Sequence, residues 1–255
     1  MPVERCNEGG DASLSGAALF NDFGQPLGRA LPEWRGAEFP PHRALHGWGC
    51  RLEPLDPERH LGDLWQAFSV DSGAMWTYLT SGPFADEAAM GVWLREVATK
   101  RDPQFYGIID EGSGRALGLA SYLRIDPLAG SIEVGWLHFS PAMQQSRLAT
   151  AAMVLMMANA FALGYRRYEW KCNALNLPSR QAALRLGFHY EGTFRQARVD
   201  KGHNRDTAWF SVIDSEWPAL KGCFERWLED GNFDHAGRQR RRLSELTAAC
   251  RSGAC

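Results

Sequence analysis

The stretch "FSPAMQQSRLATAAM", Phe139–Met153, joins a run typical of a β-strand to a long apolar helix. Ser140 and Pro141 predict a turn between the two elements. The first amides of a helix have no intrahelical partner, and the helix dipole is positive at that end. A strand-to-helix junction of this kind can therefore bind an anion, unless it is merely a turn.

The composition is that of a soluble globular protein with enough apolar residues for a large core. Of the 255 residues, 45% are hydrophobic and 23% are charged. The formal net charge of −2 gives no global basic field, which argues against nucleic acid as a partner. The longest apolar run, 148–163, contains Thr150 and Asn159 and is short for a bilayer span, so we expect no membrane association.

The cysteines are not spaced as a metal site. No pair has the Cys-x-x-Cys spacing and no histidine cluster accompanies them, so we expect no metal. The N-terminal residues are acidic and polar, where a secretory signal peptide would need an apolar stretch. We therefore expect a cytoplasmic protein with reduced thiols. The cysteines are Cys6, Cys50, Cys172, Cys223, Cys250 and Cys255.

Periodicity divides the chain into three regions. Residues 1–45 are rich in Gly, Pro and Ala and predict a partly irregular N-terminal extension. Residues 46–215 predict one compact domain. Residues 216–255 predict a C-terminal helix and a tail with the basic run "RQRRR", Arg238–Arg242, which we interpret as a solvated helix face.

The order of elements in the middle region predicts an α+β fold with helices on both faces of a sheet. It runs strand, two helices, three strands, helix, strand, helix and a closing two-stranded hairpin. The expected helices are 57–68, 84–100, 147–163 and 178–186, and the expected strands are 48–55, 104–110, 116–125, 131–139, 166–173, 188–199 and 205–213.

Three local motifs accompany this order. The first is Gln144–Ala149 at the strand-to-helix junction, the second is "NALNLPSRQAALRLGF", 173–188, and the third is Glu133, eleven residues before Gln144. Together they resemble the GNAT superfamily of acyl-CoA-dependent N-acyltransferases, and within it the branch of the ribosomal-protein N-terminal acetyltransferases. The resemblance covers about residues 48–215 and implies a mixed, mostly antiparallel central sheet.

The first motif resembles the family's pyrophosphate-binding signature, Gln/Arg-x-x-Gly-x-Gly/Ala. Arg147 stands where the family usually has glycine. Its amide can still serve if its backbone is helical, whereas a positive φ there would exclude it. The resemblance implies acetyl-CoA as cosubstrate, without a metal. The residues that it implies for cofactor binding are Leu137, His138, Phe139, Gln144, Gln145, Ser146, Arg147, Leu148, Ala149, Thr150, Asn176 and Ser179.

In the second motif, Asn176 and Ser179 fall where relatives bind the pantetheine arm and place a hydroxyl near the sulfur. Both residue types are also ordinary helix caps. Many relatives carry a tyrosine four residues before the pair Gly187-Phe188, as the acid for the departing thiolate. Here that position is Ala183, so Ser179 is the expected substitute, with a chain of waters as the competitor.

Glu133 is the candidate general base, as at this point of the strand in some relatives. An ammonium group must lose a proton before it attacks a thioester, and a carboxylate desolvated near Trp136 and Phe139 would have a raised pKa. The alternative is that Glu133 faces solvent or pairs with Arg124. His138 is a weaker candidate base, because a histidine alternating with apolar residues is more often structural.

The resemblance implies an N-acetyltransferase that moves an acetyl group from acetyl-CoA directly to a primary amine, either of a small molecule or of a protein N-terminus. Trp76, Tyr78 and Trp93 lie where relatives build the acceptor groove, and core packing is the alternative. The competing function is a non-catalytic acyl-CoA-binding module, which Arg147 and Ala183 favour. The identity of the acceptor stays open, and a homodimer is compatible with the sequence.

Overall fold

The computed structural model describes residues 19–251, and of residue 251 the backbone alone. The chain divides into two compact units between Arg35 and Gly36. In the first unit, β1 (Leu19–Phe20) and β2 (Pro26–Leu27) form an antiparallel pair. The rest of the expected N-terminal extension, residues 1–18, lies outside the described residues.

The second unit begins earlier than the expected boundary at residue 45. Its first residues are already hydrogen-bonded to the rest of this unit. The Ala37 amide donates to the Pro127 carbonyl at 2.8 Å, and the Gln104 side chain donates to the Pro40 carbonyl at 2.9 Å. A strand that we did not expect, β3 (Leu45–Gly47), then pairs with β4. These bonds join the segment to the compact unit although its sequence has no periodicity.

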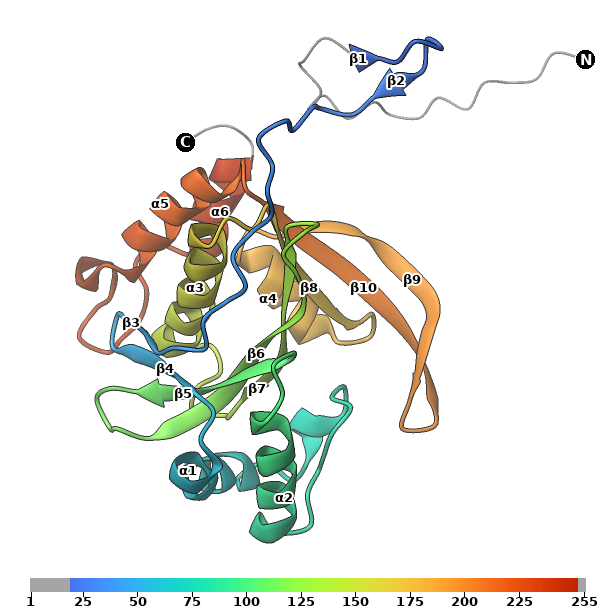
Figure 1. Cartoon of the computed structure of the whole chain (residues 1–255). Coiled ribbons are helices and arrows are strands. Elements are labelled where there is room, and N and C mark those ends of the chain that lie inside the picture. The colour runs from blue at the N-terminus through green and yellow to red at the C-terminus, as the bar shows by residue number, and fades with distance from the viewer. Residues whose placement is uncertain (1–18, 252–255) are drawn as a thin grey trace, which may run out of the picture. The chain divides into compact units, whose positions relative to one another are not determined.

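An eight-stranded sheet organises the second unit (Figure 1). Its order is β3-β4-β5-β6-β7-β8-β10-β9, and every neighbouring pair is antiparallel except β7 and β8. The remaining strands are β4 (Cys50–Pro54), β5 (Gln104–Asp110), β6 (Ala116–Asp126), β7 (Ser131–Phe139), β8 (Arg167–Asn173), β9 (His189–Asp200) and β10 (His203–Ile213). The expected mixed, mostly antiparallel sheet is confirmed.

Helices cover both faces of this sheet, as expected (Figure 1). Side-chain caps begin four of them: Asp56, Asp86, Ser146 and Asn176 each accept a hydrogen bond from an amide in the first turn. The helices are α1 (Pro57–Ser69), α2 (Glu87–Ala98), α3 (Arg147–Ala162), α4 (Leu177–Arg185), α5 (Trp217–Leu228) and α6 (Leu243–Arg251), with 3-10 turns η1 (Ala74–Trp76) and η2 (Asp230–Asn232).

Two apolar cores result, one on each face. The smaller core packs α1, α2 and η1 against β5 and β6, and includes Leu64, Leu94 and Phe105. The larger core packs α3, α4 and α5 against the other face. Because α3 has almost no polar side, it is buried along most of its length, and it fixes the helix N-terminus beside the edge of β7.

The parallel pair β7 and β8 is bonded over only half its length. Pairing ends at Val134 and Trp170, so beyond these residues the facing edges of the two strands are unpaired. A β-bulge contributes to this separation: between Gly135 and His138, β7 advances three residues while β6 advances two. Trp136, at the bulge, has a φ of 50°. The candidate active site lies at this opening between the strands.

The C-terminal region corrects two expectations. It contains a further helix, α6, where we expected a polar tail, and α6 is bonded to α4 because the Thr247 hydroxyl donates to the Arg185 carbonyl at 3.1 Å. A disulfide joins Cys223 and Cys250, so the expectation of reduced thiols is wrong for this pair, whereas Cys50 and Cys172 are free and buried. Within residues 19–251, no helix is long and apolar enough to cross a bilayer.

Candidate active site

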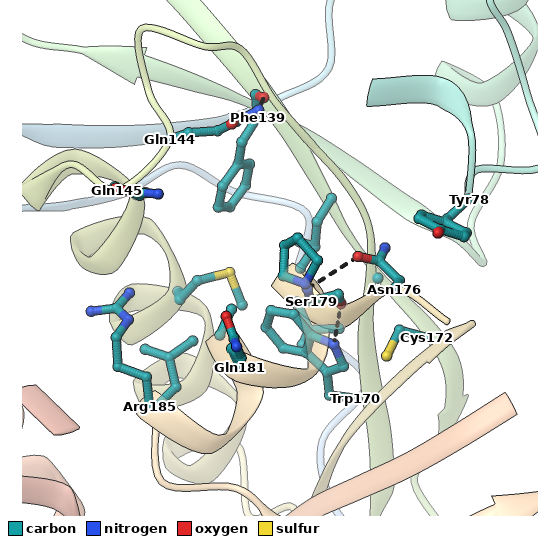
Figure 2. A pocket seen from close by; sticks show the side chains of 18 of the residues that line it. Tyr78, Phe139, Gln144, Gln145, Trp170, Cys172, Asn176, Ser179, Gln181 and Arg185 are labelled. Atoms are coloured by element: carbon teal, nitrogen blue, oxygen red, sulfur yellow. Dashed lines mark hydrogen bonds between the residues drawn. The ribbon is translucent and has the colours of Figure 1, made fainter. Parts of the chain in front are cut away.

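The opening between β7 and β8 leads into a pocket of about 1710 Å³. Its walls come from the loop before α3, the N-terminal half of α4, the segment around η1, the β9–β10 hairpin and the segment that follows α5. Figure 2 shows the loop residues Gln144 and Gln145 across the pocket from Asn176 and Ser179, with Tyr78 further along the cavity. The pocket therefore connects the strand-to-helix junction before α3 with the second motif, 173–188.

The loop before α3 is held by its own hydrogen bonds. The Ser140 carbonyl accepts from the amides of Met143 and Gln144 at 2.9 and 3.0 Å, and the Gln144 side chain donates to the Phe139 carbonyl at 2.9 Å. Gln145 has a φ of 57°, so the left-handed residue of this loop precedes Arg147. Arg147 begins α3 with an ordinary helical backbone, which removes the objection raised by its replacing glycine.

Three amides at this junction are free to bind an anion. Among the described residues, the amides of Gln145, Arg147 and Leu148 have no hydrogen-bond partner. The Ala149 amide is different, because it donates to the Ser146 hydroxyl, the N-cap of α3, at 3.1 Å. A helix N-terminus with three free amides fits a diphosphate, but Ala149 can join them only if its cap is released.

The Arg147 side chain is tied to the C-terminal segment. Its guanidinium donates to the Leu228 carbonyl, lies 2.8 Å from the Asp230 carboxylate and stacks 4.8 Å from the centre of the Phe233 ring. The side chain thus anchors the segment after α5 against the start of α3. Its contribution to an anion site is mainly the backbone amide, since its charge is already paired.

Glu133 is buried, with 3% of its surface exposed, and lines the pocket. Its Oε2 lies 2.5 Å from the Arg124 guanidinium and 2.9 Å from the Lys171 ammonium. Burial raises the pKa of Glu133 above its usual value, and the two cations partly oppose this. Two features that we expected as alternatives therefore occur together: the Glu133 carboxyl is desolvated, and it is paired with Arg124.

Lys171 is a site residue that the sequence analysis missed. Its ammonium lies 2.7 Å from Glu169 as well as 2.9 Å from Glu133, and 3.7 Å from the centre of the Trp209 ring. The only signal in the sequence was the alternation of charged and aromatic residues in β8. That pattern predicts a two-faced strand, and it does not reveal that the charged face is covered rather than solvated.

Ser179 is held by two bonds at the start of α4 (Figure 2). Its hydroxyl accepts from the Trp170 indole N–H at 3.0 Å, and its amide donates to the Asn176 Oδ1 at 3.1 Å. Because the indole occupies one acceptor position, the hydroxyl proton of Ser179 can be donated, and the Cys172 side chain is a hydrogen-bond partner of this hydroxyl. Asn176 acts as the helix cap through Oδ1, which leaves its Nδ2 group for a ligand. Cys172 lies nearby, and burial raises its pKa.

Several expected residues lie away from the pocket. His138 is fully buried, its Nδ1 lies 2.7 Å from the Trp136 carbonyl, and burial lowers its pKa to about 4. It belongs to an aromatic cluster with Trp76 and Trp93, which resolves their interpretation as core. Leu148 and Thr150 do not line the pocket with their side chains either. The expected residues that do are Glu133, Leu137, Phe139, Gln144, Gln145, Ser146, Arg147, Ala149, Asn176 and Ser179.

The far end of the pocket lies between the η1 segment and the β9–β10 hairpin, the long curved orange arm of Figure 1. Trp209 stacks on Phe194 at 4.5 Å, and its buried indole N–H, like the Thr207 hydroxyl, has no partner among the described residues. Lys201, at the tip of the hairpin, donates to the carbonyls of Trp76 and Gly82 at 2.8 and 2.7 Å. The hairpin tip is thereby fixed to the opposite wall.

No group of three or more His, Cys, Asp or Glu side chains suited to a metal ion occurs in the described part of the chain. The pocket presents free amides, hydroxyls and paired charges. A mixed sheet whose two parallel strands separate beside a helix N-terminus with free amides defines the class of GNAT-type acyltransferases.

Comparisons with known proteins agree. Residues 50–189 match the family described as the acetyltransferase (GNAT) domain. A GCN5-related N-acetyltransferase from Brucella melitensis is 44% identical, with a TM-score of 0.84 over 86% of this chain and 100% of that one. A probable GNAT-family acetyltransferase from Chromobacterium violaceum is 42% identical, with a TM-score of 0.72 over 76% and 98%.

A curated relative, the ribosomal-protein-serine acetyltransferase of Escherichia coli, is 31% identical over 101 residues. The matched stretch is 39% of this chain and 56% of the relative, so it spans little more than half of that protein. The chain belongs to the GNAT family of N-acetyltransferases.

Proposed function

We propose that the protein transfers an acetyl group from acetyl-CoA directly to a primary amine, with Glu133 as the base and Ser179 as the group that stabilises the leaving thiolate. The observation that carries this proposal is one continuous pocket containing the free amides of Gln145 and Arg147, the Ser179 hydroxyl and the Glu133 carboxylate. The amides suit the diphosphate of the cosubstrate, and the separated edges of β7 and β8 suit its extended arm.

In the proposed reaction one bond forms and one bond breaks. The amine nitrogen forms a bond to the acetyl carbonyl carbon, and the bond from that carbon to sulfur breaks, which releases the thiolate of CoA. Glu133 takes the proton from the ammonium form, directly or through a water. A raised pKa suits this role, because a more basic carboxylate accepts the proton more readily.

Ser179 can assist the departing sulfur with its hydroxyl proton, once this is released from the Cys172 side chain. The indole N–H of Trp170 donates to its oxygen and fixes the orientation of the hydroxyl. The position usually occupied by tyrosine, Ala183, is fully buried in α4, and the alanine does not line the pocket. Ser179 is therefore the side chain of α4 that best fits the role.

The acceptor end favours a primary amine that carries hydrogen-bond acceptors beside it. The unpartnered donors of Thr207 and Trp209 line the pocket, and so does Tyr78, which follows η1. The N-terminus of a protein has such carbonyl oxygens, and so has an amino-acid-like small molecule. The curated relative is named for a serine of a ribosomal protein, which makes a protein N-terminus the first acceptor to test.

The experiment is to measure the release of free CoA from acetyl-CoA with a panel of small amines and N-terminal peptides. The wild type should turn over at least one of them, and Glu133→Gln should lose turnover by about 10²–10⁴-fold while keeping its affinity for CoA. The competing function, a module that only binds acyl-CoA, predicts thermal stabilisation by CoA with no release from any amine.

A further inference from the structure

The cofactor end of the pocket is lined by an unusual number of arginines, which come from two parts of the chain. Arg147 and Arg185 belong to α3 and α4, and the others belong to the basic run Arg238–Arg242. This run lies outside the stretch 50–189 that matches the family. The run is exposed, as expected, but it is not a helix face, because it precedes α6, and Arg238, Arg240 and Arg242 line the pocket.

Two of these arginines form no ion pair among the described residues. Arg147 is paired with Asp230, and Arg238 is paired with Asp234 at 2.8 Å. Arg240 and Arg242 line the pocket but form no ion pair with any carboxylate of residues 19–251. Guanidinium groups that are not engaged in an ion pair are available to bind an anion in the pocket.

The backbone of the basic run is fixed rather than left to move freely. Asn232 is 8% exposed and holds it at both sides: the Arg240 amide donates to the Asn232 carbonyl at 2.7 Å, and the Arg241 amide donates to its Oδ1 at 2.9 Å. The Trp227 indole donates to the Gln239 side chain at 2.9 Å. A prearranged backbone reduces the entropy lost when a ligand binds.

Arg185, in α4, also lines the pocket. It is half-buried, and its guanidinium donates to the Thr150 hydroxyl at 3.2 Å, a neutral partner at the start of α3. Burial lowers its pKa, which means that its positive charge lacks compensation in the protein. Figure 2 shows its side chain extended toward the loop that carries Gln145. Arg185 and the arginines of the basic run therefore line the same pocket as the free amide of Gln145.

We propose that Arg240 and Arg242 form a binding site for a phosphate monoester, the ribose 3′-phosphate of CoA, and that Arg185 contacts the adjoining diphosphate. This inference rests on the proposed function. A monoester carries up to two negative charges and three acceptor oxygens, which suits a pair of guanidinium groups. The basic run then selects the cosubstrate by its phosphate, independently of the acetyl group.

The test compares the affinities of the full chain for CoA and for dephospho-CoA, which lacks only that phosphate, by calorimetric titration. The wild type should bind CoA at least tenfold more tightly. The double variant Arg240→Gln/Arg242→Gln should lose at least tenfold in affinity for CoA and nothing for dephospho-CoA. Arg241→Gln is the matched control, because it removes the same charge from the same run at an exposed position that does not line the pocket.

The outcomes separate this inference from the proposed function. If the wild type binds both ligands equally, or if the double variant keeps the preference, the phosphate site is refuted while the acetyltransferase proposal stands. An equal loss in Arg241→Gln would also refute it, since it would indicate a general charge effect. Failure of the wild type to bind either ligand would overturn both the phosphate site and the acetyltransferase proposal.

A single-stranded RNA tests the other source of phosphates. If the double variant loses affinity for RNA but keeps the preference for CoA over dephospho-CoA, the proposed site is refuted. Melting curves verify that each variant is folded.

Discussion

The ammonium group of Lys171 lies 2.9 Å from the carboxylate of Glu133, and both side chains are almost completely shielded from solvent. This pair sets the proton affinity of the candidate base. Burial raises the pKa of Glu133, whereas Lys171, and then Arg124, lower it. The balance between burial and these two cations thus determines how readily the carboxyl accepts a proton.

Lys171→Met should shift the pH dependence of turnover. Without the ammonium group, the strongest cause that lowers the pKa of Glu133 is lost, so that pKa rises further. Because the base works in its ionised form, the acidic limb of the profile of kcat/KM against pH should move to higher pH. Breaking the buried pair should also cost about 3 kcal/mol of unfolding free energy. An acidic limb that stays in place would contradict the coupling.

Glu133→Gln should remove the acidic limb of the profile of kcat/KM against pH. A raised folded-state pKa means that the native state holds this proton more tightly than the unfolded state does, so the stability linked to Glu133 is present at low pH and is lost as pH rises through the folded pKa. Relative to wild type, Glu133→Gln should therefore lose less stability between acidic and neutral pH. Urea unfolding at several pH values measures this difference, and kinetics under the same conditions measure the limb.

The sequence alone predicts most of the regular elements. Strands β5 and β7 match the expected ranges 104–110 and 131–139, and α3 ends one residue before its expected end, because local periodicity and the stop at Gly164 determine these segments. β3 was missed because a three-residue strand has too little periodicity to detect. α6 was missed because its packing depends on contacts with α4 that are remote in sequence.

The candidate site could be predicted in its residue types but not in its geometry. The resemblance of three motifs to the GNAT family indicates Glu133, Gln145 and Ser179. Nothing in the sequence indicates the bulge at Trp136, since a tryptophan with a positive φ is a conformation imposed by the surrounding sheet. The partners of the Arg147 side chain and the position of the basic run depend on long-range contacts in the same way.

Ser179→Ala should separate catalysis from stability. Removal of the hydroxyl leaves the Trp170 indole N–H without its acceptor, which should cost about 1–3 kcal/mol of unfolding free energy. Loss of the donor to the thiolate should lower kcat by about tenfold or more, with little change in the affinity for CoA. Ser179→Thr keeps the hydroxyl and serves as the control. If Ser179→Ala loses stability but retains full kcat, a water supplies the proton and Ser179 is a structural residue.

The affinity for CoA should depend on the backbone conformation at Gln145 rather than on the Gln145 side chain. At a φ of 57°, glycine is readily accommodated, whereas a β-branched residue is strained by about 1–2 kcal/mol. Gln145→Gly should therefore keep the affinity for CoA within a few-fold, and Gln145→Val should weaken it by about tenfold as the neighbouring amides shift. Titration with CoA distinguishes the two. Equal losses in both variants would mean that the Gln145 side chain itself binds the ligand.

Lys201→Met should affect the acceptor and leave the cosubstrate unchanged. Its ammonium group holds the hairpin tip to the carbonyls of Trp76, Ser81 and Gly82, at distances between 2.7 and 3.3 Å. Methionine keeps the length of the side chain but makes none of these bonds, so the far wall of the pocket becomes mobile. We expect KM for the amine to rise several-fold, because binding must then order the hairpin. The affinity for CoA should stay constant, since the cofactor end has no contact with Lys201. A parallel loss of CoA affinity would mean that the hairpin tip supports the whole pocket rather than its acceptor end.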